Sequence, residues 1–276
     1  MIKNGKTVSV NEHIPLGEHK AYDQPSVFTA ANLLREARRQ KGLAEGSVPA
    51  FCVLDPDGDL LDYLGAHNRA QAHETWACYH TRLYTIVEDG WEWGLIGRVV
   101  GAPFAVLVAE ELFASGCQLL VSITSAGQLR AIGQPPYVVL IEQALRDEGT
   151  SYHYLPPAPY SVLSPLWRES ILAHWDQARL PLVVGASWTT DAPFRETEPM
   201  LAWGREQGML AIEMEAAALY ALAMARHSSI VCFAHITNQM AQAEGDFEKG
   251  AANGSETALE IIAQVAHIWQ KHRIST

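Results

Sequence analysis

The chain has 276 residues, of which 48% are hydrophobic, and a formal net charge of -11 at pH 7. This length and apolar fraction suffice for one sizeable hydrophobic core, so a single folded domain is expected. Because nucleic acids and anionic membranes are bound through clustered Lys and Arg, the acidic balance disfavours both as partners. The first residues lack the apolar core of a signal peptide and no stretch is apolar for long enough to cross a bilayer, so we expect a cytoplasmic location.

The N-terminal half alternates between helical and strand-like segments. Thr29 can cap a helix over residues 30–41 that Gly42 ends, and the apolar run 50–54 predicts a strand that stops in the turn 55–59. We expect a helix over residues 67–80 and a β-hairpin over residues 82–97 with its turn at positions 89 and 90. Pro103 opens a further helix that Gly116 ends, and residues 117–124 predict a strand buried on both faces.

The C-terminal half continues the alternation. Residues 137–145 fit a strand better than a helix, residues 164–177 predict a helix, and residues 180–187 predict a buried strand followed by a loop over 188–194. Another helix is expected over residues 211–225, then a strand over 228–237 and a C-terminal helix from Ser255 to Lys271. The four cysteines are far apart without a C-x-x-C pair, so we expect buried free thiols.

This order of elements predicts an α/β fold. We expect a single domain with a mixed, mainly parallel twisted sheet that is flanked by helices on both faces. Residues 1–49 would form an N-terminal extension with one helix packed on the core, and residues 50–276 would form the α/β domain.

Ligands of such sheets bind outside the carboxyl ends of the strands. Polar or small residues follow several predicted strands, at positions 55–59, 122–127, 187–191 and 237–238. Their convergence would form a pocket for an uncharged, hydrogen-bonding small molecule whose aromatic part packs on Trp188 or Phe194. The alternative, ordinary turn chemistry, applies to each segment taken alone.

The stretch AIEMEAAALYALAMA places two carboxylates, Glu213 and Glu215, on either side of Met214. In an extended segment both carboxylates would point to one face, with Met214 opposite. A carboxylate at the mouth of a pocket can accept hydrogen bonds from two vicinal hydroxyls, as on a ribose. Glu215 could instead be an acid in the first turn of a helix, and the residues alone leave both readings open.

At this segment the chain resembles a known family. AIEMEAAALYALA followed by VCFAHITN is similar to the V/I-E-M-E-x-A-x-L/I segment and the next strand of the nucleoside phosphorylase superfamily. GAPFAVLVAEELFASG, SITSAGQL and VVGASWTTDAPF resemble three other segments of that family in the same order. The resemblance spans roughly residues 50 to 270 and implies the phosphorylase/hydrolase-like α/β fold for the domain over residues 50–276.

The resemblance also implies an activity and a set of site residues. Glu215 would accept hydrogen bonds from the ribose hydroxyls, Met214 would pack on the sugar, and Glu213 would support the site. Asn238 would face the base as the second catalytic residue beside Glu215. The remaining substrate-binding residues would be Trp188 and Phe194 in the aromatic loop and Ser125 and Gly127 in the T/S-x-G loop. Such an enzyme cleaves the N-glycosidic bond of a nucleoside, with phosphate as a possible co-substrate and no other cofactor, and its relatives are homo-oligomers.

The chain departs from the family at the phosphate site. Phosphorolytic relatives carry a G-D-P-D-R loop, where this chain has Leu54 and Gly58, and an arginine at the end of the central strand, where it has Ser122. Ser122 and Ser125 would remain for phosphate or water, and Arg82 or Arg98 could supply the missing charge from another direction, although both also fit ordinary surface arginines. A phosphate dianion without cationic partners would be poorly bound.

Two other functions therefore stay open beside phosphorolysis. One is hydrolysis of the nucleoside, in which Asp55, Asp57 or Asp59 would act as a general base. The other is a nucleoside-binding protein that no longer catalyses a reaction. Asn238 can donate a hydrogen bond to a base but cannot protonate it, and His235 could be a proton donor or a core residue. The histidines and cysteines lack metal-ligand spacing, so no metal is expected.

Overall fold

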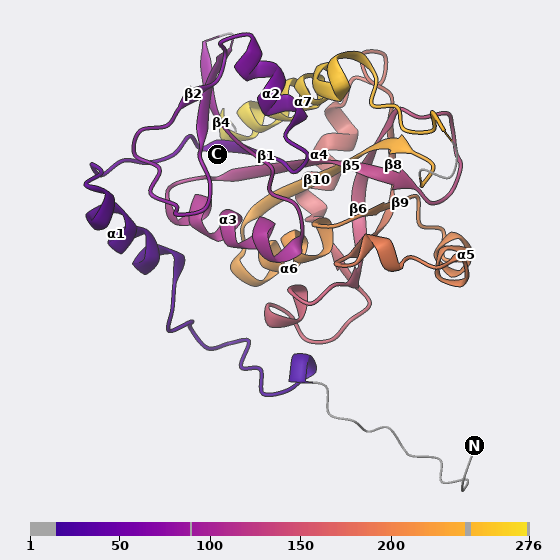
Figure 1. Ribbon diagram of the computed structural model, residues 1–276, viewed down its shortest axis with the longest axis horizontal. Helices are drawn as coiled ribbons and strands as arrows, with labels where there is room; N and C mark the ends of the chain where they lie inside the picture. Colours follow the sequence, from indigo (N-terminus) through magenta and orange to yellow (C-terminus); the bar gives the residue numbers. More distant parts are fainter. Residues whose placement is uncertain (1–14, 89, 241–243, 275–276) are drawn as a thin grey trace, which may run out of the picture.

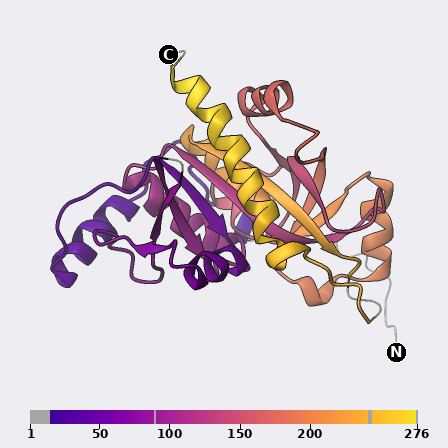
Figure 2. The same cartoon turned by 90° about the horizontal axis from the view of Figure 1, so that it is seen from above.

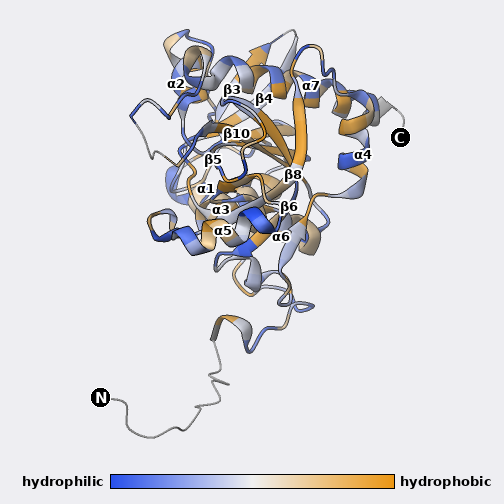
Figure 3. Cartoon of the chain, turned by 90° about the vertical axis from the view of Figure 1, so that its right-hand side faces the viewer, coloured by the Kyte–Doolittle hydropathy of each residue, from blue (hydrophilic) through white to orange (hydrophobic). Residues whose placement is uncertain are grey.

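The computed structural model of the protein describes residues 15–88, 90–240 and 244–274. A long sheet runs through the middle of the molecule, and helices pack on both sides of it (Figures 1 and 2). Figure 3 shows many hydrophobic residues in the central strands, whereas the helices alternate between hydrophobic and hydrophilic residues along their length. None of the described helices is long and apolar enough to span a bilayer.

The strands and helices follow the expected alternation. The strands are β1 (Phe51–Asp55), β2 (Gln71–Ala72), β3 (Tyr84–Glu88), β4 (Trp91–Gly97), β5 (Leu119–Gln128), β6 (Tyr137–Asp147), β7 (Tyr160–Val162), β8 (Leu182–Thr190), β9 (Ala211–Glu213) and β10 (Ser229–Asn238). The helices are α1 (Ala30–Lys41), α2 (Asp59–Ala66), α3 (Ala102–Ala114), α4 (Pro165–His174), α5 (Glu198–Glu206), α6 (Ala216–Arg226) and α7 (Ser255–Ile274).

The sheet is partly closed on itself. β10 pairs with both β5 and β6, so the order β10-β6-β8-β9-β5 returns to β10, while β1, β4, β3 and β2 extend outward from β5. The single α/β domain is as expected, but the sheet is not mainly parallel. Parallel and antiparallel pairings are equally numerous among the described strands, because β6 returns antiparallel beside β10, and β9 pairs antiparallel with β5.

Local sequence signals account for several elements. The Thr29 hydroxyl caps α1 by accepting a hydrogen bond from the backbone N–H of Asn32, and Gly42 ends α1 in the left-handed conformation. The strands of the predicted hairpin pair antiparallel as β3 and β4; of its expected turn residues, position 89 lies outside the described residues. All four cysteines are buried free thiols, as predicted.

Three element predictions were wrong. The helix expected over residues 67–80 lies earlier, as α2, because Gly58 turns the chain with a φ of 88° directly before Asp59, and Asn68 adopts a left-handed φ of 55° just after the helix. Residues 188–190 extend β8 instead of forming a loop, since β6 offers pairing partners as far as Thr190. The helix expected over residues 211–225 begins only at Ala216, after the short strand β9, and α5 was not foreseen.

The segment before β1 forms one helix, α1, which packs against α3. Residues 15–29 contain the short 3-10 helix Pro15–Gly17 and lie below the body of the molecule in the view of Figure 1. The first 14 residues of the expected N-terminal extension lie outside the described residues, and the boundary at residue 49 stays a prediction.

Tyr220 ties helix α6 to the interior of the sheet. Its side chain is fully buried. The Tyr220 hydroxyl donates to the carbonyl of Ile141 in β6 at 2.6 Å and accepts from the backbone N–H of Cys232 in β10 at 3.1 Å. One phenol oxygen therefore serves the two strands whose pairing closes the sheet.

Replacing Tyr220 with Phe should lower the free energy of unfolding by about 1–3 kcal/mol, because the Ile141 carbonyl loses its phenol donor and the Cys232 N–H its acceptor inside the core. Urea denaturation followed by circular dichroism measures the change. Tyr79→Phe is the matched control, since the Tyr79 hydroxyl bonds to Gln40 at the surface. Equal effects of the two substitutions would contradict the role given to Tyr220.

Candidate functional site

One edge of β5 is unpaired over four residues. On this edge β5 pairs with β1 as far as Ser122 and meets β9 only at Gly127, so within the described part of the chain residues 123–126 have no neighbouring strand there. On the other edge β10 accompanies β5 along its length, with His235 beside Ser125 and Asn238 beside Gly127. The carboxyl ends of β1, β5 and β10 therefore meet where the sheet opens, which is where α/β proteins bind ligands.

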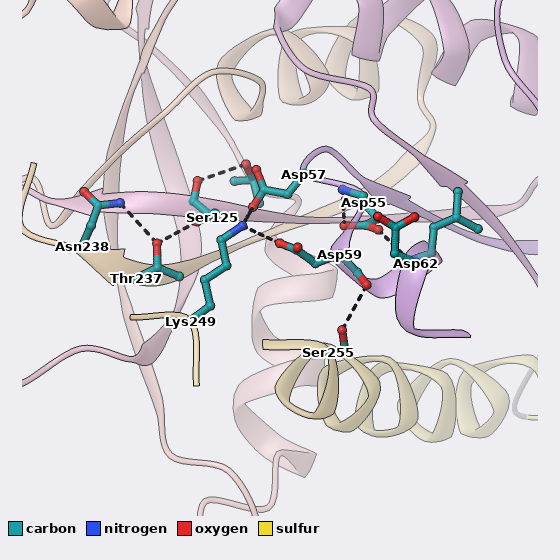
Figure 4. Close-up of polar contacts among 12 residues, drawn as sticks. Asp55, Asp57, Asp59, Asp62, Ser125, Thr237, Asn238, Lys249 and Ser255 are labelled. Carbon is teal, nitrogen blue, oxygen red and sulfur yellow. Dashed lines mark hydrogen bonds and ion pairs between the residues drawn. The ribbon is translucent and has the colours of Figure 1, made fainter. Parts of the chain in front are cut away.

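A cleft lies at this opening (Figure 4). Its walls come from four parts of the chain: the loop after β1, the residues of β5 beside the gap, the end of β10, and the first turn of α7 with the loop before it. The polar side chains among its lining residues are those of Asp55, Asp57, Asp59, Thr124, Ser125, His235, Lys249, Asn253 and Ser255. The sequence analysis had proposed Ser125 and the three aspartates for this place.

Asp55 shapes the loop after β1. Its carboxylate accepts hydrogen bonds from the backbone N–H groups of Gly58 at 3.1 Å and Leu61 at 3.0 Å, which fixes the turn into α2. Burial raises the pKa of Asp55 to about 6, although these two hydrogen bonds oppose the rise. Asp55 is therefore a carboxyl group that changes its charge close to neutral pH.

Lys249 enters the cleft from the loop between β10 and α7. Its ammonium group contacts the carboxylates of Asp57, at 3.0 Å, and Asp59. Figure 4 shows the Lys249 side chain reaching between the aspartate loop and the polar group formed by Ser125, Thr237 and Asn238. Burial lowers the pKa of Lys249, but the contacts with Asp59 and Asp57 outweigh burial and raise it, so the lysine is charged.

Ser125 lines the cleft and contacts the end of β10. The hydroxyls of Ser125 and Thr237 are 2.7 Å apart, and the Asn238 amide donates to Thr237 at 3.2 Å. The Asn238 carbonyl oxygen accepts from the backbone N–H of Met240, whose sulfur atom lies against Gly127. Ser125, Gly127 and Asn238, which the sequence assigned to the substrate, thus lie together.

His235 lies on the wall of the same cleft. Its side chain is 6% exposed and packs against Gly254, and its Nε2 atom has no hydrogen-bond partner among the described residues. Burial, together with the nearby Lys249, lowers the pKa of His235 to about 4. The imidazole is therefore neutral at pH 7 and is a hydrogen-bonding group there rather than an acid.

The carboxylate of Glu213 holds the start of helix α6. One oxygen accepts from the hydroxyls of Ser187, at 3.0 Å, and Thr189, at 2.5 Å; the other accepts from the backbone N–H groups of Glu215 and Ala216, both at 2.7 Å. Burial raises the pKa of Glu213 and the four donors oppose that rise. The two backbone N–H groups require an acceptor, so the negative charge resides on Glu213. The helix-start role considered for Glu215 belongs to Glu213.

Glu215 lies between the opening of β5 and the turn before α3. One oxygen accepts from the backbone N–H of Gly101 at 2.7 Å, and the other has no partner in the part of the chain that the structure describes. Burial and the neighbouring charge of Glu213 raise the pKa of Glu215 to about 8, against the opposing effects of Gly101 and Thr124. Met214 is only partly buried beside it. Glu215 thus has one buried oxygen without a hydrogen-bond partner among the described residues, although Glu215 does not line the described cleft.

Several predicted site residues lie elsewhere. The Trp188 side chain is 1% exposed, packs in the core near Leu201 and donates its indole N–H to Asp147 at 2.9 Å, whereas Phe194 is fully exposed. The structure does not bring this pair together as an aromatic wall. The physical reason is that β8 continues through residue 190 and directs the indole into the core.

The arginines and Ser122 are not brought to the cleft either. Arg98 covers the outside of the Gly58 turn and forms an ion pair with Asp62 at 2.6 Å, and Arg82 lines a separate groove beside Tyr79. Ser122 is buried, and its hydroxyl has no hydrogen-bond partner among the described residues. Of Ser122, Ser125, Arg82 and Arg98, only Ser125 is among the residues that line the described cleft.

Lys249 and the start of α7 are site residues that were not predicted from the sequence. A signal was available, because Lys249 is the only Lys or Arg between Arg226 and Lys271. Such an isolated cation close before the helix start at Ser255 could have been tested as the missing charge. The sequence does not show that Lys249 lies next to Asp57 in space, because the two residues are 192 positions apart along the chain.

Replacing Glu213 with Gln should destabilise the protein by about 1–3 kcal/mol, because an amide has one acceptor oxygen where four donors now share two. The midpoint of chemical denaturation reports the loss. Glu198→Gln is the matched control, an exposed acid in the first turn of α5 whose replacement should change stability by less than ~0.5 kcal/mol. A stability of Glu213→Gln like that of the control would refute the capping role.

Glu215→Gln should have the opposite effect, and only at higher pH. The pKa of Glu215 is raised from 4.5 to about 8 in the folded protein, so between these values the folded state keeps a proton that the unfolded state loses. The wild type must therefore lose stability as pH rises from 5 to 8, whereas the glutamine variant lacks this term. If the substitution recovers ~2 kcal/mol of the free energy of unfolding at pH 8, the melting temperature of the variant rises by roughly 4–8 °C above that of the wild type. Parallel curves of melting temperature against pH would show that Glu215 is ionised in the folded protein.

The chain matches known proteins in sequence. Residues 51–267 match the family model of the phosphorylase superfamily. A guanosine phosphorylase of Halorubrum lacusprofundi is 31% identical over 187 residues, which cover 65% of this chain and 74% of that protein. A purine nucleoside phosphorylase of the DeoD type from a Geobacillus species is 28% identical over 134 residues, which cover 46% of this chain and 54% of that relative.

Solved structures share the fold. A uridine phosphorylase of Vibrio fischeri superimposes with a TM-score of 0.67 at 18% identity, over 82% of this chain and 97% of that one. A purine nucleoside phosphorylase of Toxoplasma gondii in complex with immucillin-H superimposes with a TM-score of 0.66 at 16% identity, over 80% and 91%. The family match, the shared fold and the site at the opening of β5 lead to one conclusion: the chain belongs to the phosphorylase superfamily.

Proposed function

We propose that the protein cleaves the N-glycosidic bond of a nucleoside by phosphorolysis. The observation that carries the proposal is the free oxygen of Glu215, a buried carboxyl group beside the unpaired edge of β5. The similar proteins are named guanosine, purine nucleoside and uridine phosphorylases, and these names support phosphorolysis as the reaction type.

In this proposal the sugar lies between Met214 and the cleft. Glu215 accepts hydrogen bonds from the ribose hydroxyls. This requires the ionised carboxylate, or one that shares its proton with a neighbour, and the hydrogen bonds offset the cost of burying its charge. As the carbon–nitrogen bond breaks, positive charge develops on the sugar, and an oxygen of phosphate forms the new bond to the anomeric carbon. Holding the sugar and the nucleophile in one place supplies much of the rate enhancement.

The base would lie toward Asn238. The Asn238 amide, now bonded to Thr237, can turn its N–H toward an acceptor on the base, as suits a 6-oxopurine or a pyrimidine. Because an amide has no proton to give, the proton that the departing base takes up would come from water. Trp188 and Phe194, placed by resemblance in this region, would need a different arrangement of the chain to contact the base.

Hydrolysis is the second candidate, and one observation favours it. Three carboxyl groups line the cleft beside a single lysine, an arrangement that suits a water molecule better than it suits a dianion. Asp55, with a pKa of about 6, would take the proton of the attacking water, and the products would be the free sugar and the base.

The family's homo-oligomeric assembly and a cytoplasmic location stay predictions. Val27 and Phe28, on the segment before α1, are apolar side chains exposed to 99% and 73%. A second copy of the chain would cover residues of this kind. Arg82, in its separate groove, would belong to the site of another copy if it contributes to catalysis at all.

The assay is release of free base from a panel of purine and pyrimidine nucleosides, separated by chromatography, with and without phosphate in otherwise phosphate-free buffer. We expect base and sugar 1-phosphate with phosphate present. Glu215→Ala should lower kcat/KM about 10²- to 10⁴-fold, because one or two hydrogen bonds to a charged group are lost, while Glu198→Ala should leave it unchanged.

Each of the other outcomes selects a different function. Cleavage that is independent of phosphate and yields free sugar would establish the hydrolase. Binding of a nucleoside without cleavage of any member of the panel would establish a protein that binds but does not catalyse. Full activity of Glu215→Ala would remove Glu215 from the sugar site.

A further inference from the structure

Lys249 is the one cationic side chain among the residues that line the described cleft. It comes from the loop between β10 and α7, not from the strand ends or the first loop, where the family resemblance had placed the phosphate arginines. We propose that Lys249 binds the phosphate co-substrate and that Asp57 and Asp59 compete with phosphate for it. This inference rests on the proposed phosphorolysis.

The surroundings of Lys249 provide the other groups that an oxyanion needs. The hydroxyls of Thr124 and Ser125 lie on the same cleft wall, and both can donate hydrogen bonds. His235 contributes a neutral imidazole that is only 6% exposed. Its Nε2 atom has no hydrogen-bond partner among the described residues. A ring nitrogen left unbonded at the wall of a polar cleft indicates a ligand group that completes it.

Helix α7 directs its positive end to the same place. It is 20 residues long, and Gly254 and Ser255 at its start line the cleft. The backbone N–H groups at a helix start favour a nearby anion, and the long helix places them at a fixed position. The helix start adds to the ammonium group of Lys249; it is not the argument for the site.

The two aspartates set the strength of binding. In the unliganded protein they accept the ammonium of Lys249, and their side chains are 33% and 30% exposed. The ammonium of Lys249 has three N–H donors and two of them bond to Asp57 and Asp59, so a phosphate dianion must bind beside these carboxylates or displace one of them. Removing the charge of an aspartate should therefore strengthen phosphate binding, both by freeing the lysine and by removing a repulsion.

The test is the KM for phosphate at a saturating nucleoside concentration. Lys249→Gln should raise this KM on the order of 10- to 100-fold with less than ~3-fold change in the KM for nucleoside. Lys249→Arg should restore at least part of the loss, since it keeps the charge. Asp57→Asn should lower the KM for phosphate by ~3-fold or more, the opposite direction. Lys271→Gln is the control, because this exposed lysine lies ~24 Å along α7 from the cleft.

Lys249 could instead only pin the loop to the aspartates. In that case Lys249→Gln and Asp57→Asn would both loosen the loop and would change the two KM values in the same direction, which would overturn the proposal. An unchanged KM for phosphate in Lys249→Gln, in a variant whose circular dichroism spectrum matches the wild type, would overturn it as well.

A second readout separates this inference from the proposed function. Millimolar phosphate should raise the melting temperature of the wild type and of Asp57→Asn, but not that of Lys249→Gln. If no nucleoside is cleaved while this pattern holds, phosphorolysis fails and the anion site stands. If base is released with phosphate while Lys249→Gln is stabilised as fully as the wild type, phosphorolysis stands and the role of Lys249 fails.

Discussion

The geometry of the site depends on the four hydrogen bonds of Glu213. Its carboxylate joins Ser187 and Thr189 of β8 to the backbone at the start of α6, so the direction in which the chain leaves β9 is fixed. Glu215, two residues on, is the N-cap residue of that helix. The negative charge of Glu213 that fixes the helix start also disfavours a second negative charge nearby. It therefore contributes, beside burial, to the raised pKa of Glu215. Glu213 thus fixes the position of Glu215 and, together with burial, raises its pKa.

The closure of the sheet then determines where a ligand can bind. Because β10 pairs with β6 as well as β5, five strands form a ring. On the outer edge of β5, pairing with β1 ends at Ser122 and pairing with β9 starts at Gly127. The unpaired edge of β5 between them exposes backbone polar groups that a folded protein normally satisfies. A ligand or a water molecule could satisfy them, and the loops after β1 and β10 supply side chains around this place.

Local patterns in the sequence predicted most of the helices and strands, whereas the roles of the site residues stay predictions. Thr29 and Gly42 bound α1 because caps are local, and Ser125, Gly127 and Asn238 meet because they end strands that pair in register. Trp188 was misplaced because its role depends on how far β6 offers a partner to β8. Lys249 was missed because its carboxylate partners precede it by 190 residues or more, a relation that no local pattern contains.

The charges in the cleft bear on both reactions considered for this protein, phosphorolysis and hydrolysis. An arginine fork binds a phosphate through several fixed donors, whereas a lysine offers a single mobile charge that neighbouring carboxylates can take up. In this protein, Asp57 and Asp59 hold that charge while the cleft is free of phosphate, and Asp55 loses its proton near pH 6. Below about pH 6 Asp55 is neutral, which removes one negative charge from the cleft and favours an anion there. Above this pH the Asp55 carboxylate repels an anion and can act as a base, which favours water. In the proposed function the choice of nucleophile would therefore depend on three aspartates and one lysine rather than on the sugar site.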